Sequence, residues 1–215
     1  MRTFAHAFRF MGEHPHLLLE KTGQHLELSG AALGIALLLA LPLGLWLGHL
    51  HRGLFLAASV SNVGRALPSL VLIAFGLTVF GIGFWNNTVA LVVLAIPPIL
   101  TNAFFAIDAC DRDVVDAARG MGMTELEVLR RVELPLGLPL VLAGIRISAI
   151  FVIATATIAS IAGGGGLGDI IVNQPTYGLA GVVAASLWVS ALAFLAALIL
   201  AVVRRAASPR PVPVP

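Results

Sequence analysis

Long apolar stretches, separated by shorter polar ones, run along most of this chain and predict helices that cross a membrane. An α-helix rises about 1.5 Å per residue, so about 20 apolar residues span the hydrocarbon layer of a bilayer. Stretches of that length lie at about residues 28–48, 54–80, 84–107, 136–161 and 179–203. We therefore expect an all-α membrane protein with about five transmembrane helices.

Proline and glycine mark the places where two of these helices should bend. In the second stretch, Gly64 and Pro68 flank the charged Arg65, which predicts a broken or kinked helix rather than two full spans. In the third stretch, the consecutive Pro97 and Pro98 should force a bend.

The composition supports integration into a membrane. Of the 215 residues, 59% are hydrophobic and only 11% are charged, whereas a soluble domain carries about 25% charged residues. The net charge of +2 is too small to indicate a nucleic-acid partner, so we expect membrane lipid around the chain and no nucleic acid. The first ten residues lack the apolar core of a secretory signal, and insertion is expected to rely on the internal stretches.

The distribution of Lys and Arg indicates the orientation, because cytoplasmic loops of membrane proteins are enriched in both. If the polar segment 108–133 is cytoplasmic, the outer loops 81–84 and 162–178 contain neither residue. Five spans then place the C-terminus in the cytoplasm and the N-terminus outside. Only the N-terminal segment departs from the rule, with Arg2, Arg9 and Lys21.

The chain is accordingly expected to have three parts. Residues 1–27 form an N-terminal extracytoplasmic segment, and residues 28–205 form a transmembrane domain that includes a cytoplasmic loop at 108–135. Residues 206–215 are rich in proline and are expected to form a disordered cytoplasmic tail.

The cytoplasmic loop has the pattern of two short helices around a glycine turn. Val114, Ala117, Ala118 and Met121 recur at i, i+3, i+4 and i+7, which puts them on one helical face. Such an arrangement should expose the small side chains of Ala117 and Ala118, so that the backbone of a partner can approach closely. An ordinary amphipathic surface loop would show the same periodicity.

The ends of both short helices are also marked. Gly120 and Gly122 should end the first helix, because glycine adopts the left-handed conformation of a C-cap without a steric penalty. Thr124 should begin the second, with Glu127 three residues later completing a capping box. That helix is expected to end at Leu134-Pro135.

The loop resembles the EAA signature of permease subunits in bacterial binding-protein-dependent ABC importers. That signature is Glu-Ala-Ala, three residues, Gly, nine residues, Ile, any residue and Leu-Pro. This chain matches every spacing, with Asp in place of Glu and Val in place of Ile, at Asp116, Ala117, Ala118, Gly122, Val132, Leu134 and Pro135. The resemblance implies a MetI-like fold and a coupling helix that seats in a groove on a separate ATPase subunit.

The resemblance also implies further partners, namely a second permease in a homo- or heterodimer and an extracytoplasmic solute-binding protein. ATP and magnesium would bind the ATPase subunit, and no cofactor is expected in this chain. Its only lysine, Lys21, does not follow a glycine, so the Gly-Lys-Ser/Thr loop that holds phosphates is absent. We therefore expect a transport subunit and not an enzyme.

Other segments resemble, within this family, the permeases for the osmoprotectants glycine betaine, carnitine and choline. These segments lie at residues 24–29, 65–70, 118–123, 132–135, 143–146 and 154–158. At residues 66–69 the chain has Ala-Leu-Pro-Ser where family members often have Thr-Ile-Pro-Ser. Methionine importers share the general plan, so a permease for another small solute such as an amino acid is the alternative.

Two other classes of function fit the chain less well. Proton- or sodium-coupled secondary transporters usually need carboxylates inside the membrane, and none lies in the five apolar stretches. A membrane-embedded enzyme would need paired carboxylates or a cluster of metal ligands in the spans, and neither stands out. The sequence identifies no catalytic, metal-binding or substrate-binding residues.

Several single features have more than one interpretation. The glycine run 163–168 formally matches G-x-G-x-x-G, but no strand precedes it, so we expect a flexible extracellular turn beside Asp169. The histidines all precede Arg52 and are expected to be interfacial or solvated. Cys110 is expected to be a small buried or loop residue. Arg65 and Arg146 could each face the interior of the bundle or lie at a helix break or interface.

Overall fold

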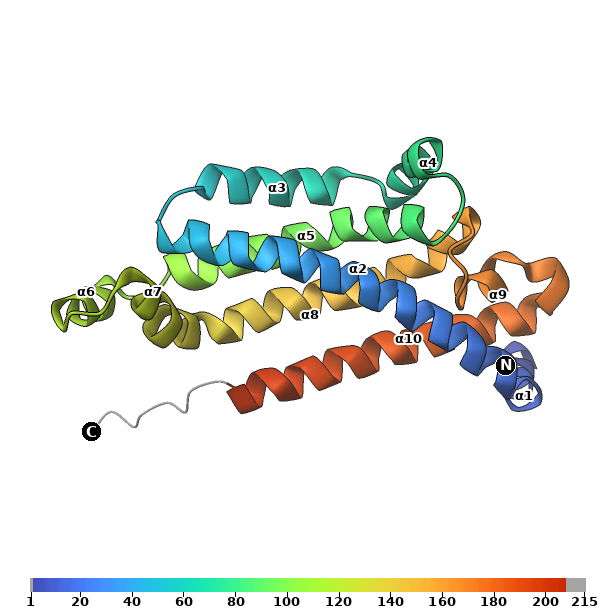
Figure 1. The fold of residues 1–215 in the computed structure, drawn as a ribbon. Helices are drawn as coiled ribbons and strands as arrows, with labels where there is room; N and C mark the ends of the chain where they lie inside the picture. The colour runs from blue at the N-terminus through green and yellow to red at the C-terminus, as the bar shows by residue number, and fades with distance from the viewer. Residues whose placement is uncertain (1, 208–215) are drawn as a thin grey trace.

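Helices make up nearly all of residues 2–207, the part of the chain that the computed structural model describes apart from the side chains of Arg2 and Arg65 (Figure 1). In chain order they are α1 (Arg2–Glu13), α2 (Pro15–His49), α3 (Leu54–Ala66), α4 (Ser69–Phe80), α5 (Phe84–Asp108), α6 (Arg112–Gly120), α7 (Glu125–Val128), the π-helical turn η1 (Leu129–Glu133), α8 (Leu134–Ala159), the 3-10 turn η2 (Ser160–Ala162), α9 (Gly168–Val172) and α10 (Gln174–Ala207). Most of the tail predicted at 206–215 lies outside the described residues.

The predicted all-α architecture with about five apolar spans is confirmed. Among the described residues, four helices are long and apolar enough to cross a membrane: Pro15–His49, Phe84–Asp108, Glu125–Ala162 and Gln174–Ala207. Helices α3 and α4 make up a fifth apolar segment, which is broken by a bend of 91°. Figure 1 shows α3 alongside the bundle and α4 turned across the direction of α3. Helix α4 still packs against the bundle, since Ile73 is buried against Ala90 of α5 and Ala162 of η2.

The break between α3 and α4 lies where the sequence predicted it. Leu67 and Pro68 have extended backbones, with ψ of 118° and 126°. The proline ring disfavours a helical conformation for the residue before it, so the helix has to end there. Arg65 lies in the last turn of α3, which places its backbone beside this helix break.

Small residues let α2 pack closely against α5. At four-residue intervals α2 buries one residue after another on the same face: Leu28, Ala32, Ala36, Ala40, Gly44 and Gly48. A Cβ on Gly44 would lie 2.7 Å from the carbonyl oxygen of Leu100, and one on Gly48 would lie 2.6 Å from that of Phe104. Small residues of this kind are the usual means by which membrane helices bring their backbones together.

Helix α8 packs on the other side of α5 in the same way. A Cβ on Gly144 would lie 2.8 Å from the carbonyl oxygen of Pro98. The hydroxyl of Ser148, which is fully buried, donates a hydrogen bond of 2.8 Å to the carbonyl oxygen of Ala95. Helices α2, α5 and α8 therefore form the centre of the bundle, with α3 and α10 at its sides (Figure 1).

The glycine run between α8 and α9 is packed against the other helices and is not an isolated turn. Gly163, Gly165 and Gly166 have positive φ angles of 73°, 69° and 81°. The backbone N–H of Gly166 donates to Gln24 Oε1 at 3.0 Å, and Lys21 Nζ forms an ion pair of 2.6 Å with Asp169. A helix and not a strand precedes the run, so it lacks the context of a dinucleotide site, as predicted.

The N-terminal segment is helical, which the sequence analysis missed. Helix α1 lies against the start of α10, where the rings of Phe10 and Tyr177 meet edge to face at 6.5 Å. Ala7 is fully buried. Helix α2 begins at Pro15 and not near residue 28, because it continues as a polar helix beyond the apolar part of the span.

Gly44 allows a test of the close packing between α2 and α5. Replacing it with Ala should place a methyl group against the backbone of Leu100 and destabilise the fold by about 1–3 kcal/mol, the usual cost of overpacking. Gly34→Ala on the same helix is the matched control, since nothing lies within 4 Å of a Cβ there. Thermal unfolding in detergent should show a lower midpoint for Gly44→Ala alone. Equal midpoints for the two variants would contradict the packing described.

Candidate functional site

The loop between α5 and α8 projects from one end of the bundle, opposite α1 and α9 (Figure 1). It has a small hydrophobic core of its own. Val115, Ala118 and Val128 are buried, and Cys110, Met123 and Val132 pack around them. The loop is therefore a folded unit held between the ends of two spans.

The glycine turn of this loop has the hydrogen bonds of a Schellman motif. Gly122 N–H donates to the carbonyl oxygen of Arg119 at 2.9 Å, and Met123 N–H donates to that of Ala118 at 3.3 Å. Gly122 has a φ of +86°, which residues with a Cβ rarely adopt. The predicted end of α6 at Gly120 and the left-handed turn at Gly122 are both confirmed.

The capping box predicted for the second helix is confirmed, but the predicted end of that helix is wrong. Thr124 N–H donates to Glu127 Oε2 at 3.0 Å at the start of α7. Helix α7 passes through the π-helical turn η1 directly into α8. Leu134 and Pro135 therefore begin the span α8, and the second loop helix does not end at them. Proline is tolerated here because the widened turn precedes it and Pro135 lies in the first turn of α8.

The outward face of α6 differs in part from the face predicted. Ala117 is exposed, and the exposed fractions of Val114 and Met121 are 44% and 73%. Ala118 is only 2% exposed, so the prediction that it is exposed is wrong. Its side chain lies on the inner face with Val115, because α6 turns that face toward the core of the loop.

The other residues matched to the signature take different positions. Asp116 has a side chain that is 72% exposed, and Arg119 Nη1 lies 3.5 Å from its Oδ1. Gly122 is exposed at the turn, and Val132 and Leu134 are half-buried in η1 and at the start of α8. Asp116, Ala117 and Gly122 are thus all exposed on the loop.

The sequence analysis missed a buried polar contact beneath the loop. His49, at the end of α2, is 4% exposed, and its Nδ1 lies 2.6 Å from Oε2 of the fully buried Glu133. Its Nε2 lies 3.1 Å from Glu125 Oε2. The prediction of solvated or interfacial histidines is wrong for His49, and also for His25, whose Nε2 lies 2.9 Å from the carbonyl oxygen of Ile153.

Polar contacts continue from Glu125 to the surface of the loop. Arg119 donates to both carboxylate oxygens of Glu125, at 3.2 and 2.9 Å. This hydrogen bonding lowers the pKa of Glu125 below its ordinary value. A continuous series of contacts therefore joins Glu133 and His49, through Glu125 and Arg119, to the exposed Asp116.

Cys110 and the histidines do not form a metal site. Burial raises the pKa of the Cys110 thiol, and the nearby carboxylate of Glu133 raises it further. The thiol is therefore neutral and poorly reactive at neutral pH. No group of three or more His, Cys, Asp and Glu residues within the described part of the chain is placed to hold a metal ion.

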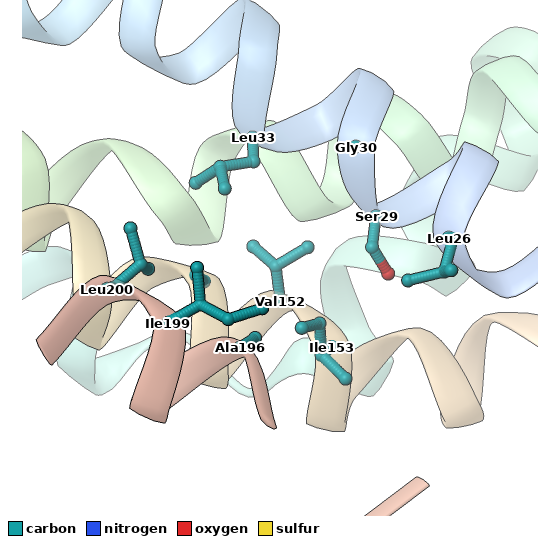
Figure 2. Close-up of a pocket in the computed structure, with 10 residues that line it drawn as sticks. Leu26, Ser29, Gly30, Leu33, Val152, Ile153, Ala196, Ile199 and Leu200 are labelled. Carbon is teal, nitrogen blue, oxygen red and sulfur yellow. The ribbon is translucent and has the colours of Figure 1, made fainter. Parts of the chain in front are cut away.

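A cavity between α2, α8 and α10 does not have the chemistry of a solute site (Figure 2). Its lining is almost entirely apolar and contains no charged side chain: Leu26, Ser29, Gly30, Leu33, Ala149, Val152, Ile153, Ala196, Ile199 and Leu200. Arg146 lies in the middle of α8, and its buried Nε has no hydrogen-bond partner in residues 2–207. The buried Nε agrees better with a side chain that faces the interior of the bundle than with one that reaches the membrane interface.

Comparison with known proteins supports the family predicted from the sequence. A family model described as the binding-protein-dependent transport system inner membrane component matches residues 40–209. The glycine betaine/carnitine/choline transport system permease protein OpuCB of Bacillus subtilis (strain 168) is 38% identical over 198 residues, which cover 90% of this chain and 89% of the relative. The choline transport system permease protein OpuBB of the same organism is 37% identical, with coverages of 95% and 94%.

Solved structures show the same fold. An inward-facing structure of the MetNI methionine ABC transporter has a TM-score of 0.75 and 22% identity, over 91% of this chain and 99% of that one. The expected MetI-like fold is thus confirmed. The prediction of a transport subunit is also confirmed, since the relatives are permease proteins. The chain belongs to the inner membrane components of binding-protein-dependent transport systems, the permease subunits of ABC importers.

Proposed function

We propose that this permease imports osmoprotectants such as glycine betaine, carnitine or choline, and that its α6–α7 loop docks the ATPase subunit that drives import. The observation that carries the docking role is the outer face of α6. It presents Asp116 and Ala117 beside the exposed apolar Val114 and Met121, at one end of the bundle.

This face has the properties of a protein-docking surface. Exposed apolar side chains grouped on an otherwise polar segment mark interaction sites. The small Ala117 leaves room for a partner between Val114 and Met121, which are much larger. The capping box and the Schellman turn hold α6 and α7 in a fixed arrangement, so that little order has to be gained on docking.

The same loop is built to transmit movement into the membrane. Residues Glu125–Ala162 form one continuous helical segment, from α7 through η1 to α8 and η2. A displacement of the loop is therefore passed to α8 along one continuous helix. ATP and magnesium are proposed to bind the partner ATPase, where hydrolysis would take place.

A second permease copy is proposed to complete the translocation path, in a homo- or heterodimer. Helix α8 is central to the bundle, yet Ile147, Phe151 and Leu136 on one side of it are 51%, 44% and 50% exposed.

The loop and the C-terminus are proposed to lie in the cytoplasm and the N-terminus outside. A solute-binding protein would then dock at the opposite end, around the glycine run.

The proposed cargo rests on sequence similarity and not on a visible site. The relatives that are 37–38% identical carry names that specify choline, carnitine and glycine betaine. The methionine and other amino acid transporters share the fold at 22% identity, which leaves another small solute, such as an amino acid of the methionine type, as the weaker alternative.

Gly122→Val should uncouple ATP hydrolysis from uptake. A β-branched residue at a φ of +86° is strained, so the turn would open and α6 would lose its orientation. Gly120→Ala is the matched control, because Gly120 is helical and nothing lies within 4 Å of a Cβ there. Both are assayed in proteoliposomes with the ATPase and the solute-binding protein. Normal uptake by Gly122→Val at normal abundance would count against the docking role.

The cargo can be identified by uptake in a strain without osmoprotectant transporters. The chain is expressed with its ATPase and solute-binding protein, and radiolabelled glycine betaine, choline, carnitine and methionine are supplied in turn. At least one of the three quaternary amines should accumulate in an ATP-dependent way. Accumulation of methionine alone would replace the osmoprotectant assignment with the amino acid alternative.

A further inference from the structure

The ring of His49 lies between two carboxylates that come from different elements. Glu133 of η1 approaches Nδ1 at 2.6 Å, and Glu125 of α7 approaches Nε2 at 3.1 Å. His49 itself closes α2. One imidazole thus connects the end of the first span with α7 and η1, the helical segment that leads from the α6–α7 loop into α8.

These two contacts require two protons. A carboxylate oxygen is only an acceptor, so each contact needs a hydrogen between the ring nitrogen and the oxygen. The His49–Glu133–Glu125 cluster can hold both protons on an imidazolium ring, or one on the ring and one on Glu133. With a single proton, a ring lone pair faces a carboxylate, and one of the two contacts is lost.

The contact to Glu125 is the one that breaks when a proton leaves. Glu133 is fully buried, and its Oε1 has no hydrogen-bond partner in the described chain, so it retains the shorter contact. The side chain of Glu125 is 61% exposed and also binds Arg119. It can therefore turn toward water and stay solvated.

The other ionisable groups around the ring do not provide a substitute proton. Arg119 of α6 pairs with Glu125 and Asp116, and a guanidinium has no proton to give up near neutral pH. His51 pairs with Asp108 of α5 at 3.0 Å. The Cys110 Sγ donates to the backbone carbonyl oxygen of Glu133 and not to its carboxylate.

We propose that His49 is a positioning residue for coupling, whose protonated cluster holds the end of α2 to the docking loop. Loss of the second proton as the cytoplasmic pH rises releases Glu125 and weakens the coupling between ATP hydrolysis and uptake. The contact is present at low pH and lost as pH rises, because it exists only in the protonated state. This inference rests on the docking role proposed above.

The test is the number of solute molecules taken up per ATP hydrolysed, in proteoliposomes that contain the whole transporter. The pH on the ATPase side is varied in steps from about 6 to 9. The ratio should fall with rising pH for the natural sequence. His49→Gln should give a low ratio at every pH, because a neutral amide lacks a second N–H donor directed at the opposite carboxylate.

Glu125 supplies a second variant that does not disturb the buried part of the cluster. An amide at this position accepts from a ring N–H or donates to a ring lone pair, so Glu125→Gln should keep a high ratio that does not change with pH. His51→Gln is the control and should keep the natural pH profile. A flat profile for the natural sequence, or an unchanged profile in His49→Gln, would overturn the proposal.

Trp46 gives a readout that does not involve the ATPase. Its ring centroid lies 6.0 Å from that of His49, and an imidazolium quenches indole fluorescence. With Trp85→Phe and Trp188→Phe, the fluorescence of Trp46 should rise with pH, and His49→Gln should remove this transition. A fluorescence transition with a constant coupling ratio would refute the role of His49 alone. Absence of any ATP-driven uptake would refute the proposed function itself.

Discussion

The close approach of α2, α5 and α8 is the constraint on which the rest of the structure depends. Apolar surface gains little from association inside a bilayer, because the lipid is as apolar as the side chains. The helices are therefore held by van der Waals contact, which requires their backbones to meet. Gly44 and Gly48 of α2 and Gly144 of α8 allow that contact by leaving no Cβ in the way.

This packing also fixes the position of the α6–α7 loop. The loop is attached to the end of α5 and to the start of α8, and both helices belong to the central group. Gly48 brings the end of α2 against Phe104 and Asp108 of α5. The next residue, His49, is thereby placed beside Glu133 at the base of the loop. A membrane packing motif and a buried polar contact are thus consecutive in the sequence.

The sequence was sufficient for features that depend on local chemistry. The lengths of the apolar stretches predicted the spans, and Pro68 predicted the break between α3 and α4. Thr124 with Glu127, and Gly122, predicted the ends of the loop helices, because capping involves neighbours in the chain. The assignment of the segment from Asp116 to Pro135 as an ATPase-coupling loop stays a prediction.

Features that depend on contacts between distant segments could not be predicted in this way. Which face of α6 is buried depends on Val128, which folds back from α7, so periodicity alone did not reveal that Ala118 is internal. His49 and Glu133 are separated by 84 positions, and nothing local indicates that they pair. Helix α1, in contrast, has a local signal. Its apolar residues recur at i, i+3, i+4 and i+7, at Phe4, Ala7, Phe8 and Met11, which is the period of a helix.

Disulfide trapping between the loop and the ATPase is the most direct test of docking by the outer face of α6. Cys110, the only natural cysteine, is first replaced with Ala. Ala117→Cys and Ala118→Cys are then each combined with single cysteines along the surface groove of the ATPase. Docking by α6 predicts a cross-link from position 117, which is exposed, and none from position 118, which is buried. Absence of a cross-link from position 117 at every groove position, in a transporter that still couples hydrolysis to uptake, would contradict it.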